Sequence, residues 1–113
     1  MQDCIFCKIA SGVIVTEKLY EDDIFFIVKD IEPKAKLHYL AIPKNHYALL
    51  SQMQTNDAAN LGHIVKTIAD KAELLGFTNG YRLIVNQGAD AGQTVFHLHM
   101  HILGGQPMDF PNF

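Results

Sequence analysis

The sequence predicts a single α+β domain built around an antiparallel sheet. The chain has 113 residues, which fits one compact domain spanning residues 1–113. Short apolar segments separated by turn residues fall into two groups, and the short connections within each group favour antiparallel pairing of neighbouring strands. One long amphipathic segment, residues 55–75, lies between the two groups. This order of strands and helices is typical of the α+β class.

Each strand is predicted from an apolar segment bounded by turn residues. Residues 24–28, Ile-Phe-Phe-Ile-Val, form a nearly continuous apolar run that is typical of a central strand. The five expected strands are residues 13–20, 24–28, 37–42, 81–86 and 95–103. A short helix over residues 4–10 should precede them, capped by Asp3 and ending just before Gly12.

The long helix is predicted from hydrophobic residues that recur every three or four positions. These residues should form one buried stripe, which consists of Leu61, Ile64, Val65, Ile68, Ala72 and Leu75. Gly76 stands where a residue in the left-handed conformation commonly ends a helix. His63 lies off the stripe, so we expect its side chain to be exposed to solvent.

The composition is that of a globular protein and excludes several classes of partner. Hydrophobic residues make up 49% of the chain and charged residues 19%, with a formal net charge of -3 and a pI of about 6.0. No stripe of Lys and Arg is present, so we expect no nucleic acid as a partner. No apolar run approaches the ~18 residues that a membrane span requires. The first residues do not resemble a secretion signal, so we expect a cytoplasmic protein with reduced cysteines.

The most informative motif is His97-Leu98-His99-Met100-His101. In a strand, side chains alternate between faces, so the three histidines should share one face and line a surface or cleft. At a rise of about 3.3 Å per residue, His97 and His101 would lie about 13 Å apart, too far to bind one metal ion together. Neutral imidazole is a nucleophile that attacks phosphorus, and a second histidine can stabilise phosphoryl oxygens. The alternatives are an ordinary polar strand face and a metal site without covalent catalysis.

A glycine-rich polar loop, residues 87–94, directly precedes the histidines. Glycines let backbone N–H groups approach a phosphate closely, and the Gln93 and Thr94 side chains can donate to its oxygens. Asn86, before the loop, is suited either to orient a histidine or phosphate or to cap the end of a strand. The position of the loop favours an anion site.

Cys4 and Cys7 form a Cys-x-x-Cys pair, which is a zinc signal only when two further ligands are available. The candidates for these further ligands are His38, His46, His63 and one histidine of the triad. His46 is in a loop after Pro43, where a ligand is easily presented. The alternative is a pair of reduced, half-buried thiols that bind no metal.

Taken together, these segments resemble the histidine-triad (HIT) superfamily. Residues 97–103 match its His-φ-His-φ-His-φ-φ pattern, in which φ is an apolar residue. The resemblance extends to residues 4–9, to residues 30–33 with 38–46, and to Asn86 with residues 92–94. The Leu103-Gly104-Gly105 segment and the short tail after it are similar to the Hint branch, the histidine-triad nucleotide-binding proteins. The Cys-x-x-Cys pair resembles that of the zinc-binding bacterial type.

The resemblance implies a HIT-like fold whose sheet continues across a homodimer. It also implies hydrolysis or transfer at P–N or phosphoanhydride bonds of purine nucleoside monophosphate derivatives, through a nucleotidyl-histidine intermediate. His99 would be the nucleophile, His101 would contact the phosphate and the leaving group, and His38 would orient His99. The implied nucleotide contacts, besides His99 and His101, are Asp30 to the ribose, Ile31 and Phe6 to the base, and Asn86, Gly92, Gln93 and Thr94 to the phosphate.

The resemblance further implies one structural zinc ion for each chain. Its ligands would be Cys4, Cys7, His46 and His97, a set with no open coordination position. Two other functions remain alternatives. One is a nucleotide-binding scaffold or regulatory protein whose catalysis is incidental, and the other is a dinucleoside polyphosphate hydrolase. The Leu103-Gly104-Gly105 segment argues against the second of these.

Overall fold

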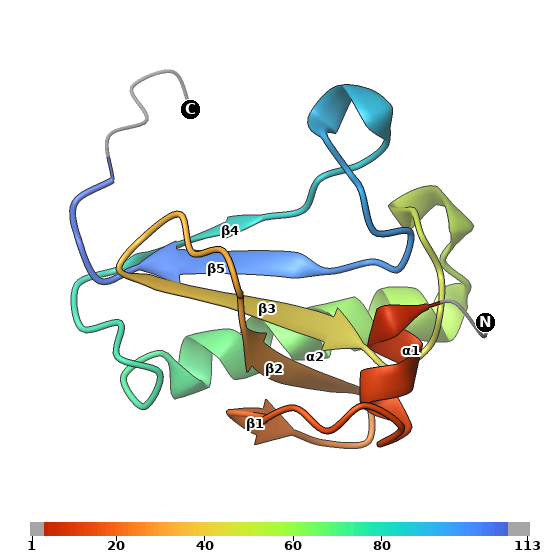
Figure 1. The fold of residues 1–113 in the computed structure, drawn as a ribbon, viewed down its shortest axis with the longest axis horizontal. Helices are drawn as coiled ribbons and strands as arrows, with labels where there is room; N and C mark the ends of the chain where they lie inside the picture. The colour runs from red at the N-terminus through yellow and green to blue at the C-terminus, as the bar shows by residue number, and fades with distance from the viewer. Residues whose placement is uncertain (1–3, 109–113) are drawn as a thin grey trace.

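The fold is a five-stranded antiparallel sheet with one long helix, and the computed structural model describes residues 4–108 of it (Figure 1). The strands are β1 (Tyr20–Glu21), β2 (Phe25–Lys29), β3 (Leu37–Pro43), β4 (Tyr81–Ile84) and β5 (Met100–Gly104). Their order across the sheet is β1-β2-β3-β5-β4, and every neighbouring pair is antiparallel. The predicted fold class is therefore confirmed.

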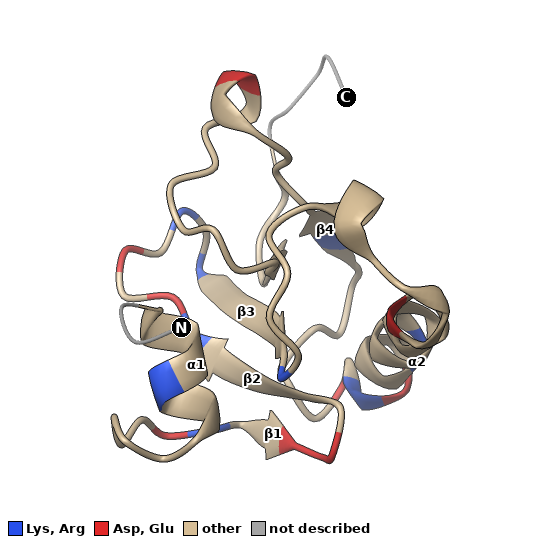
Figure 2. Ribbon diagram, turned by 90° about the vertical axis from the view of Figure 1, so that its right-hand side faces the viewer, with Lys and Arg blue, Asp and Glu red and all other residues tan. Residues whose placement is uncertain are grey.

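Two helices of unequal length cover opposite faces of the sheet (Figure 2). The long helix α2 (Thr55–Lys71) packs Ile64 and Ile68 on one face, against a core that includes Phe25, Ile27 and Ile102. The short helix α1 (Ile5–Ala10) packs on the other face, against the cluster of Phe26, Val28 and Ile42. Alternation along β2 explains this division, because residues 25 and 27 point to α2 while residues 26 and 28 point to α1. Both faces of the central strand are buried, as its continuous apolar run predicts.

Three of the strands are shorter than their sequences predict. β4 ends at Ile84, two residues before its expected end, and two others differ by more. Of residues 13–20 only Tyr20 pairs, and Val13 and Val15 are 74% and 93% exposed, because this segment passes α1 before it reaches the sheet edge. The expected strand over residues 95–103 pairs only from Met100 to Gly104. Before Met100 the chain leaves β3 and the Leu98 N–H donates to the Tyr47 carbonyl instead, at 2.7 Å. The predictions of longer strands at these three places were wrong.

The ends of the helices also differ from prediction in detail. Asp3, the predicted cap of α1, lies outside the described residues, and the sulfur of Cys4 accepts from the Cys7 N–H at the N-cap position. Helix α2 ends at Lys71, and residues 72–76 continue as turns up to Gly76, whose φ of 99° is left-handed as predicted. The helix is therefore shorter than the predicted residues 55–75, but Leu75 is buried as predicted although it lies beyond the end of the helix.

The buried stripe of α2 differs from its prediction at one residue. Val65 is 39% exposed, whereas Thr67 is buried, because the face toward the sheet is centred on Ile64, Thr67 and Ile68. The prediction that Val65 belongs to the buried stripe was therefore wrong. Among residues 4–108, neither helix combines the length and apolar character that crossing a bilayer requires.

One carboxylate fastens the turn between β1 and β2 to α2. Asp22 accepts hydrogen bonds from the backbone N–H groups of Ile24 and Phe25 at 2.8 and 3.0 Å, and from the Tyr20 hydroxyl at 2.9 Å. His63 of α2 lies 2.7 Å from the same carboxylate, so this exposed side chain also has a structural contact. Burial by itself would raise the pKa of Asp22, but these four hydrogen bonds outweigh it and lower the pKa to about 2.

We expect Asp22→Asn to destabilise the fold by about 2 kcal/mol at neutral pH, because the ionised form of Asp22 is bound more tightly in the folded state. A lowered folded-state pKa gives stability that is present above the unfolded-state pKa and is lost as the pH falls through the folded-state value. The difference in unfolding free energy from wild type should therefore shrink between about pH 4 and pH 2. Urea unfolding at several pH values measures it.

The neighbouring Asp23→Asn is the matched control for this prediction, because Asp23 is exposed. This control should leave the unfolding free energy nearly unchanged at every pH. A deficit in Asp22→Asn that stays constant down to pH 2 would show that the carboxylate charge does not provide the stabilisation.

Candidate functional site

The predicted site residues converge on the sheet face that α1 covers. His101 belongs to β5, His97 and His99 lie in the segment just before it, and His38 comes from β3. The pairing of β3 with β5 sets Leu40 opposite His101 and His38 opposite Leu103, which places both imidazoles on one face. Phe6 of α1 packs against this face, with its ring edge-on to those of His97 and His99.

The three triad histidines have different surroundings, as their predicted spacing requires. His97 is fully buried and joins a group with two cysteines and His46. His99 is half-buried and contacts Phe6, with ring centroids 5.3 Å apart. His101 contacts His38. The expectation that all three rings line a surface or cleft was wrong for His97, because its ring is fully buried between α1 and the loop after β3.

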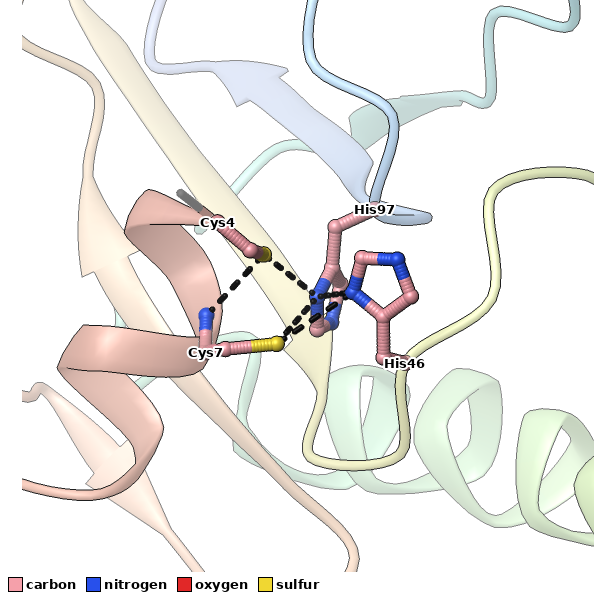
Figure 3. A group of neighbouring side chains, drawn as sticks. All are labelled: Cys4, Cys7, His46 and His97. Carbon is pink, nitrogen blue, oxygen red and sulfur yellow. Dashed lines mark hydrogen bonds between the residues drawn. The ribbon is translucent and has the colours of Figure 1, made fainter. Parts of the chain in front are cut away.

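The buried group consists of Cys4, Cys7, His46 and His97, and their ligand atoms all lie within 4.8 Å of one another (Figure 3). His97 Nδ1 is 3.3 Å from the Cys4 sulfur and 3.5 Å from the Cys7 sulfur. His46 Nδ1 is 3.2 Å from the Cys7 sulfur and 3.1 Å from His97 Nδ1. Four ligand atoms, from the start of α1, the loop after β3 and the triad segment, thus point to one centre.

These distances fit a tetrahedral metal centre. In a zinc site, Zn–S bonds of about 2.3 Å and Zn–N bonds of about 2.0 Å hold the ligand atoms about 3.3 to 3.8 Å apart. The contacts of the cluster, between 3.1 and 3.5 Å, are within a few tenths of an ångström of that spacing. Desolvation and the adjacent Cys4 sulfur raise the pKa of Cys7 to about 11.

A backbone carbonyl determines which nitrogen of His97 faces this cluster. His97 Nε2 lies 2.7 Å from the carbonyl oxygen of Pro43, and a carbonyl only accepts, so Nε2 carries the proton. The Nδ1 of the neutral ring then has a free lone pair, and it is Nδ1 that faces the sulfurs. Burial lowers the pKa of His97, which favours this neutral form. The ring is therefore prepared as a metal ligand.

A second backbone carbonyl, that of His97, determines which nitrogen of His99 is nucleophilic. His99 Nδ1 lies 2.9 Å from the carbonyl oxygen of His97, so Nδ1 carries the proton and donates it. The lone pair of the neutral ring is then on Nε2, at the outer end of the imidazole. Of the three triad histidines, His99 alone has a proton on Nδ1 and a free lone pair on Nε2. This arrangement is the one that nucleophilic attack requires.

His101 has the opposite arrangement, which originates in a backbone N–H of the loop before β3. The Lys34 N–H donates to His38 Nδ1 at 3.0 Å, so the proton of His38 is on Nε2. That Nε2 lies 2.8 Å from His101 Nδ1 and donates to it. The proton of His101 is consequently on its own Nε2, where it serves as a hydrogen-bond donor.

The surroundings of His101 keep it neutral. Burial, followed by repulsion from His99 and His38, lowers the pKa of His101 to about 4. Burial also lowers the pKa of His38, although the Asp30 carboxylate, 3.3 Å from His38 Nε2, offsets part of this effect. The β3–β5 register thus brings the His38 ring to His101, whose own ring contacts that of His99. The expectation that His38 orients His99 stays a prediction.

Asp30, His38 and His101 form a second group with metal-ligand chemistry. Their distances are explained by hydrogen bonds, since the His38 Nε2 proton lies between two acceptors. To ligate a metal through Nε2, His38 would have to give up its bond from the Lys34 N–H. The first cluster has no such conflict, so only it has the properties of a metal centre.

Known proteins share both this fold and this sequence. The family model described as "HIT domain" matches residues 11–108, nearly all of the chain. This chain belongs to the HIT family. An uncharacterized HIT-like protein of Synechocystis sp. is 44% identical over 110 residues, which is 97% of this chain and 96% of that protein. The family assignment therefore rests on the sequence of nearly the whole chain, and the arrangement of the site agrees with it.

Solved structures agree with this assignment. A HIT family hydrolase from Clostridium thermocellum has a TM-score of 0.92 and 43% identity, covering 100% of this chain and 99% of that one. A Zn-bound histidine triad family protein from Mycobacterium smegmatis has a TM-score of 0.81 and 34% identity, covering 96% of this chain and 78% of that one. The HIT fold found here thus occurs in a protein named as a hydrolase and in one named as zinc-bound.

The loop predicted to bind phosphate is held by its own hydrogen bonds in this HIT protein. The loop from Gly88 to Gly92 includes a turn of 3-10 helix, η2 (Ala89–Ala91), and both of its glycines have positive φ. Gln93 is buried, accepts from the Gly88 N–H, and donates both amide hydrogens to the carbonyls of Ala48 and Val95. Its side chain therefore holds the loop in shape. Thr94, which follows it, is exposed.

Three backbone groups complete the site, and no side-chain pattern in the sequence points to them. They are the Lys34 N–H, the Pro43 carbonyl and the His97 carbonyl, which together assign the protons of four imidazoles. Two of these groups lie within motifs that are evident in the sequence, because Pro43 begins the Pro-Lys-x-His segment and His97 begins the triad. The identity of the individual atoms required the three-dimensional arrangement.

Proposed function

We propose that this HIT protein is a purine nucleoside phosphoramidase that cleaves P–N bonds of nucleoside monophosphate derivatives. The observation that supports it most is the arrangement of protons on the histidines. His99 presents a free lone pair on Nε2, and His101 presents an N–H from Nε2. A nucleophile and a hydrogen-bond donor on one face suit in-line attack on a phosphoryl group.

The reaction begins when the Nε2 lone pair of His99 attacks phosphorus. The P–N bond breaks, and its electron pair leaves with the nitrogen, which departs as a neutral amine when the substrate nitrogen is protonated. The Nδ1 proton of His99 stays on the ring, so the positive charge of the nucleotidyl-imidazole lies beside the His97 carbonyl. His101 donates to a phosphoryl oxygen from Nε2 and remains neutral.

Water then completes the hydrolysis. It attacks phosphorus, the P–Nε2 bond breaks, and the electron pair returns to His99. The protons of the water go to a phosphate oxygen and to solvent. Because Nδ1 keeps its proton throughout, His99 returns to the form in which it started, ready for another substrate.

The nucleotide would lie along the predicted contact residues. Asp30 is adjacent to the His38–His101 pair, within reach of ribose hydroxyls, and Ile31 beside it is 95% exposed and offers an apolar surface to a base. We assign the phosphate to Asn86, Gly92 and Thr94, with Gln93 as the support of their loop. Phe6 packs against the His99 ring and closes the base side of the site.

We further propose that the Cys4–Cys7–His46–His97 cluster holds one structural zinc ion. When bound, zinc joins α1 to the triad segment and leaves no position open for substrate. The tetrahedral fit of the four ligand atoms supports this assignment. The name of the Mycobacterium smegmatis relative, which states that it is Zn-bound, supports it as well.

We also propose a homodimer in which two copies of β4 pair at the edge of the sheet. β4 pairs only with β5 among the described strands, so its outer edge is free to form a further ladder. Its apolar residues Tyr81, Leu83 and Ile84 are each only half-buried in one chain. An apolar edge strand of this kind is stabilised by pairing with a second copy.

The nucleophile is tested with His99→Asn and an adenosine 5′-phosphoramidate. Loss of a covalent nucleophile should lower turnover by at least about a thousandfold. Wild type should also form an acid-labile adduct of nucleotide mass on the peptide that contains His99. His63→Asn, on the exposed face of α2, is the matched control and should retain full turnover. If His99→Asn keeps most of its turnover, the proposed function is wrong.

The metal is tested by elemental analysis of protein purified without chelator. We expect about one zinc per chain, and a Cys7→Ser variant should lose most of it because one of four ligands is gone. His63→Ala removes an imidazole outside the cluster and should leave the zinc content unchanged. Wild-type protein without metal, or equal zinc in the Cys7→Ser variant, would contradict the assignment.

The dimer is tested by sedimentation of the full chain. Wild type should have twice the 12.6 kDa mass of one chain. Ile84→Glu places a charge on β4 and should give monomers, because charges on an edge strand oppose pairing. Val15→Glu, at an exposed apolar position outside the sheet ladder, should remain dimeric. A monomeric wild type, or a dimeric Ile84→Glu variant, would rule out this interface.

A further inference from the structure

His97 connects the metal cluster to the nucleophile through its own polar atoms. Its Nδ1 faces the Cys4 and Cys7 sulfurs and His46. Its Nε2 donates to the Pro43 carbonyl, and its backbone carbonyl accepts from His99 Nδ1. Each of these three groups points to a different part of the site. One residue therefore belongs to both the cluster and the support of His99.

The backbone around His97 has few other restraints. Residues 95–99 precede β5 and take no part in its ladder with β3. The Leu98 N–H donates to the Tyr47 carbonyl, which holds the segment to the loop that also carries His46. The position of the His97 carbonyl consequently depends on where its ring is anchored. That ring is fully buried between Pro43 and the cluster.

A second connection runs through helix α1. Cys4 and Cys7 attach this helix to the cluster, and Phe6 lies between them in sequence. The Phe6 ring is 5.8 Å from that of His97 and 5.3 Å from that of His99, both edge-on. A helix of six residues has little stability of its own, so its place on the sheet depends on Phe6, Ile9 and the two cysteines.

We propose that His97 is a positioning residue through which metal in the cluster determines which ring nitrogen of neutral His99 carries the proton. With metal on its Nδ1, the His97 ring holds the carbonyl that keeps the His99 proton on Nδ1 and the lone pair on Nε2. Without metal, the Pro43 carbonyl is the only partner of the ring that remains fixed, so the His97 carbonyl is held less firmly and His99 exchanges more readily between its two neutral tautomers. The inference rests on the proposed function in so far as it makes His99 Nε2 the attacking atom.

The effect of metal on His99 is distinct from its effect on overall stability. Any metal centre that anchors a helix stabilises a fold, but that effect alone would not change which nitrogen of His99 carries the proton. The core between α2 and the sheet contains no residue of the cluster, so it holds the main fold independently of the metal. The tautomer of His99 is therefore the distinguishing measurement.

The experiment is NMR of histidine ring nitrogens in the full chain without substrate. In zinc-loaded protein, His99 should be almost wholly in the Nδ1–H form. In His46→Ala, which removes a ligand that has no contact with His99, the ratio of Nδ1–H to Nε2–H should fall by about tenfold, the equivalent of one hydrogen bond. His63 is observed in the same spectra and should not change, because it bonds to Asp22.

A second comparison does not depend on how well His46→Ala folds. His46→Cys retains four ligands and should bind zinc and keep the His99 Nδ1–H form. Wild type loaded with Cd²⁺, a larger ion, should shift the His99 Nδ1–H resonance relative to zinc-loaded protein and leave His63 unchanged. If that resonance is the same with either metal, or if folded, metal-free His46→Ala keeps the wild-type ratio, the proposal is wrong.

These outcomes are separate from those of the activity test. The tautomer is read without substrate, so it responds to metal or fails to respond whatever reaction the site performs. If His99→Asn stays active, the proposed function fails while the positioning role of His97 is still measured. If the tautomer ignores the metal but His99→Asn is inactive, the proposed function stands and the positioning role fails.

Discussion

The hydrogen bond from His97 Nε2 to the Pro43 carbonyl, 2.7 Å long and shielded from water, is the contact on which the site depends. It leaves Nδ1 of the same ring free to face the cysteines and His46. It also anchors the segment whose carbonyl holds His99. A buried imidazole with no partner for its N–H would be costly, so Pro43 stabilises the ring in one orientation and one tautomer.

The rest of the site follows from the same physical constraint. A carbonyl oxygen accepts and a backbone N–H donates, so each fixed backbone group next to an imidazole decides where the ring proton lies. The His97 carbonyl makes His99 a nucleophile at Nε2, whereas the Lys34 N–H, acting through His38, makes His101 a donor at Nε2. Two chemically identical side chains thereby have complementary properties two residues apart. No charged group is required to distinguish them.

The sheet supplies the rigid frame for these contacts. β2 and β3 are buried on both faces, by α2 on one side and α1 on the other, and the pairing of β3 with β5 places His38 beside His101. The metal cluster gathers the parts that this ladder leaves out, namely α1, the loop after β3 and the segment before β5. The structure thus combines a hydrogen-bonded frame with a cross-link at the point where the frame ends.

Much of this was determined by the sequence alone. The spacing of apolar residues and the turn residues placed the strands and the long helix. The Cys-x-x-Cys and triad motifs contain three residues of the cluster, and the family resemblance added His46. These features are local, because side-chain periodicity and ligand chemistry are properties of short segments. Strand ends were predicted less well, as at residues 13–19 and 95–99, because pairing depends on which backbone groups a neighbour has available.

The tertiary structure decided what separates His99 from its neighbours. Spacing placed three imidazoles along one segment but gave no reason to prefer any of them, and it did not reveal that His38 contacts His101. The deciding groups are backbone atoms of Lys34, Pro43 and His97, and every residue except proline has both an N–H and a carbonyl. Only folding determines which of these groups meets which ring nitrogen, and so only the fold assigns the protons on which the chemistry depends.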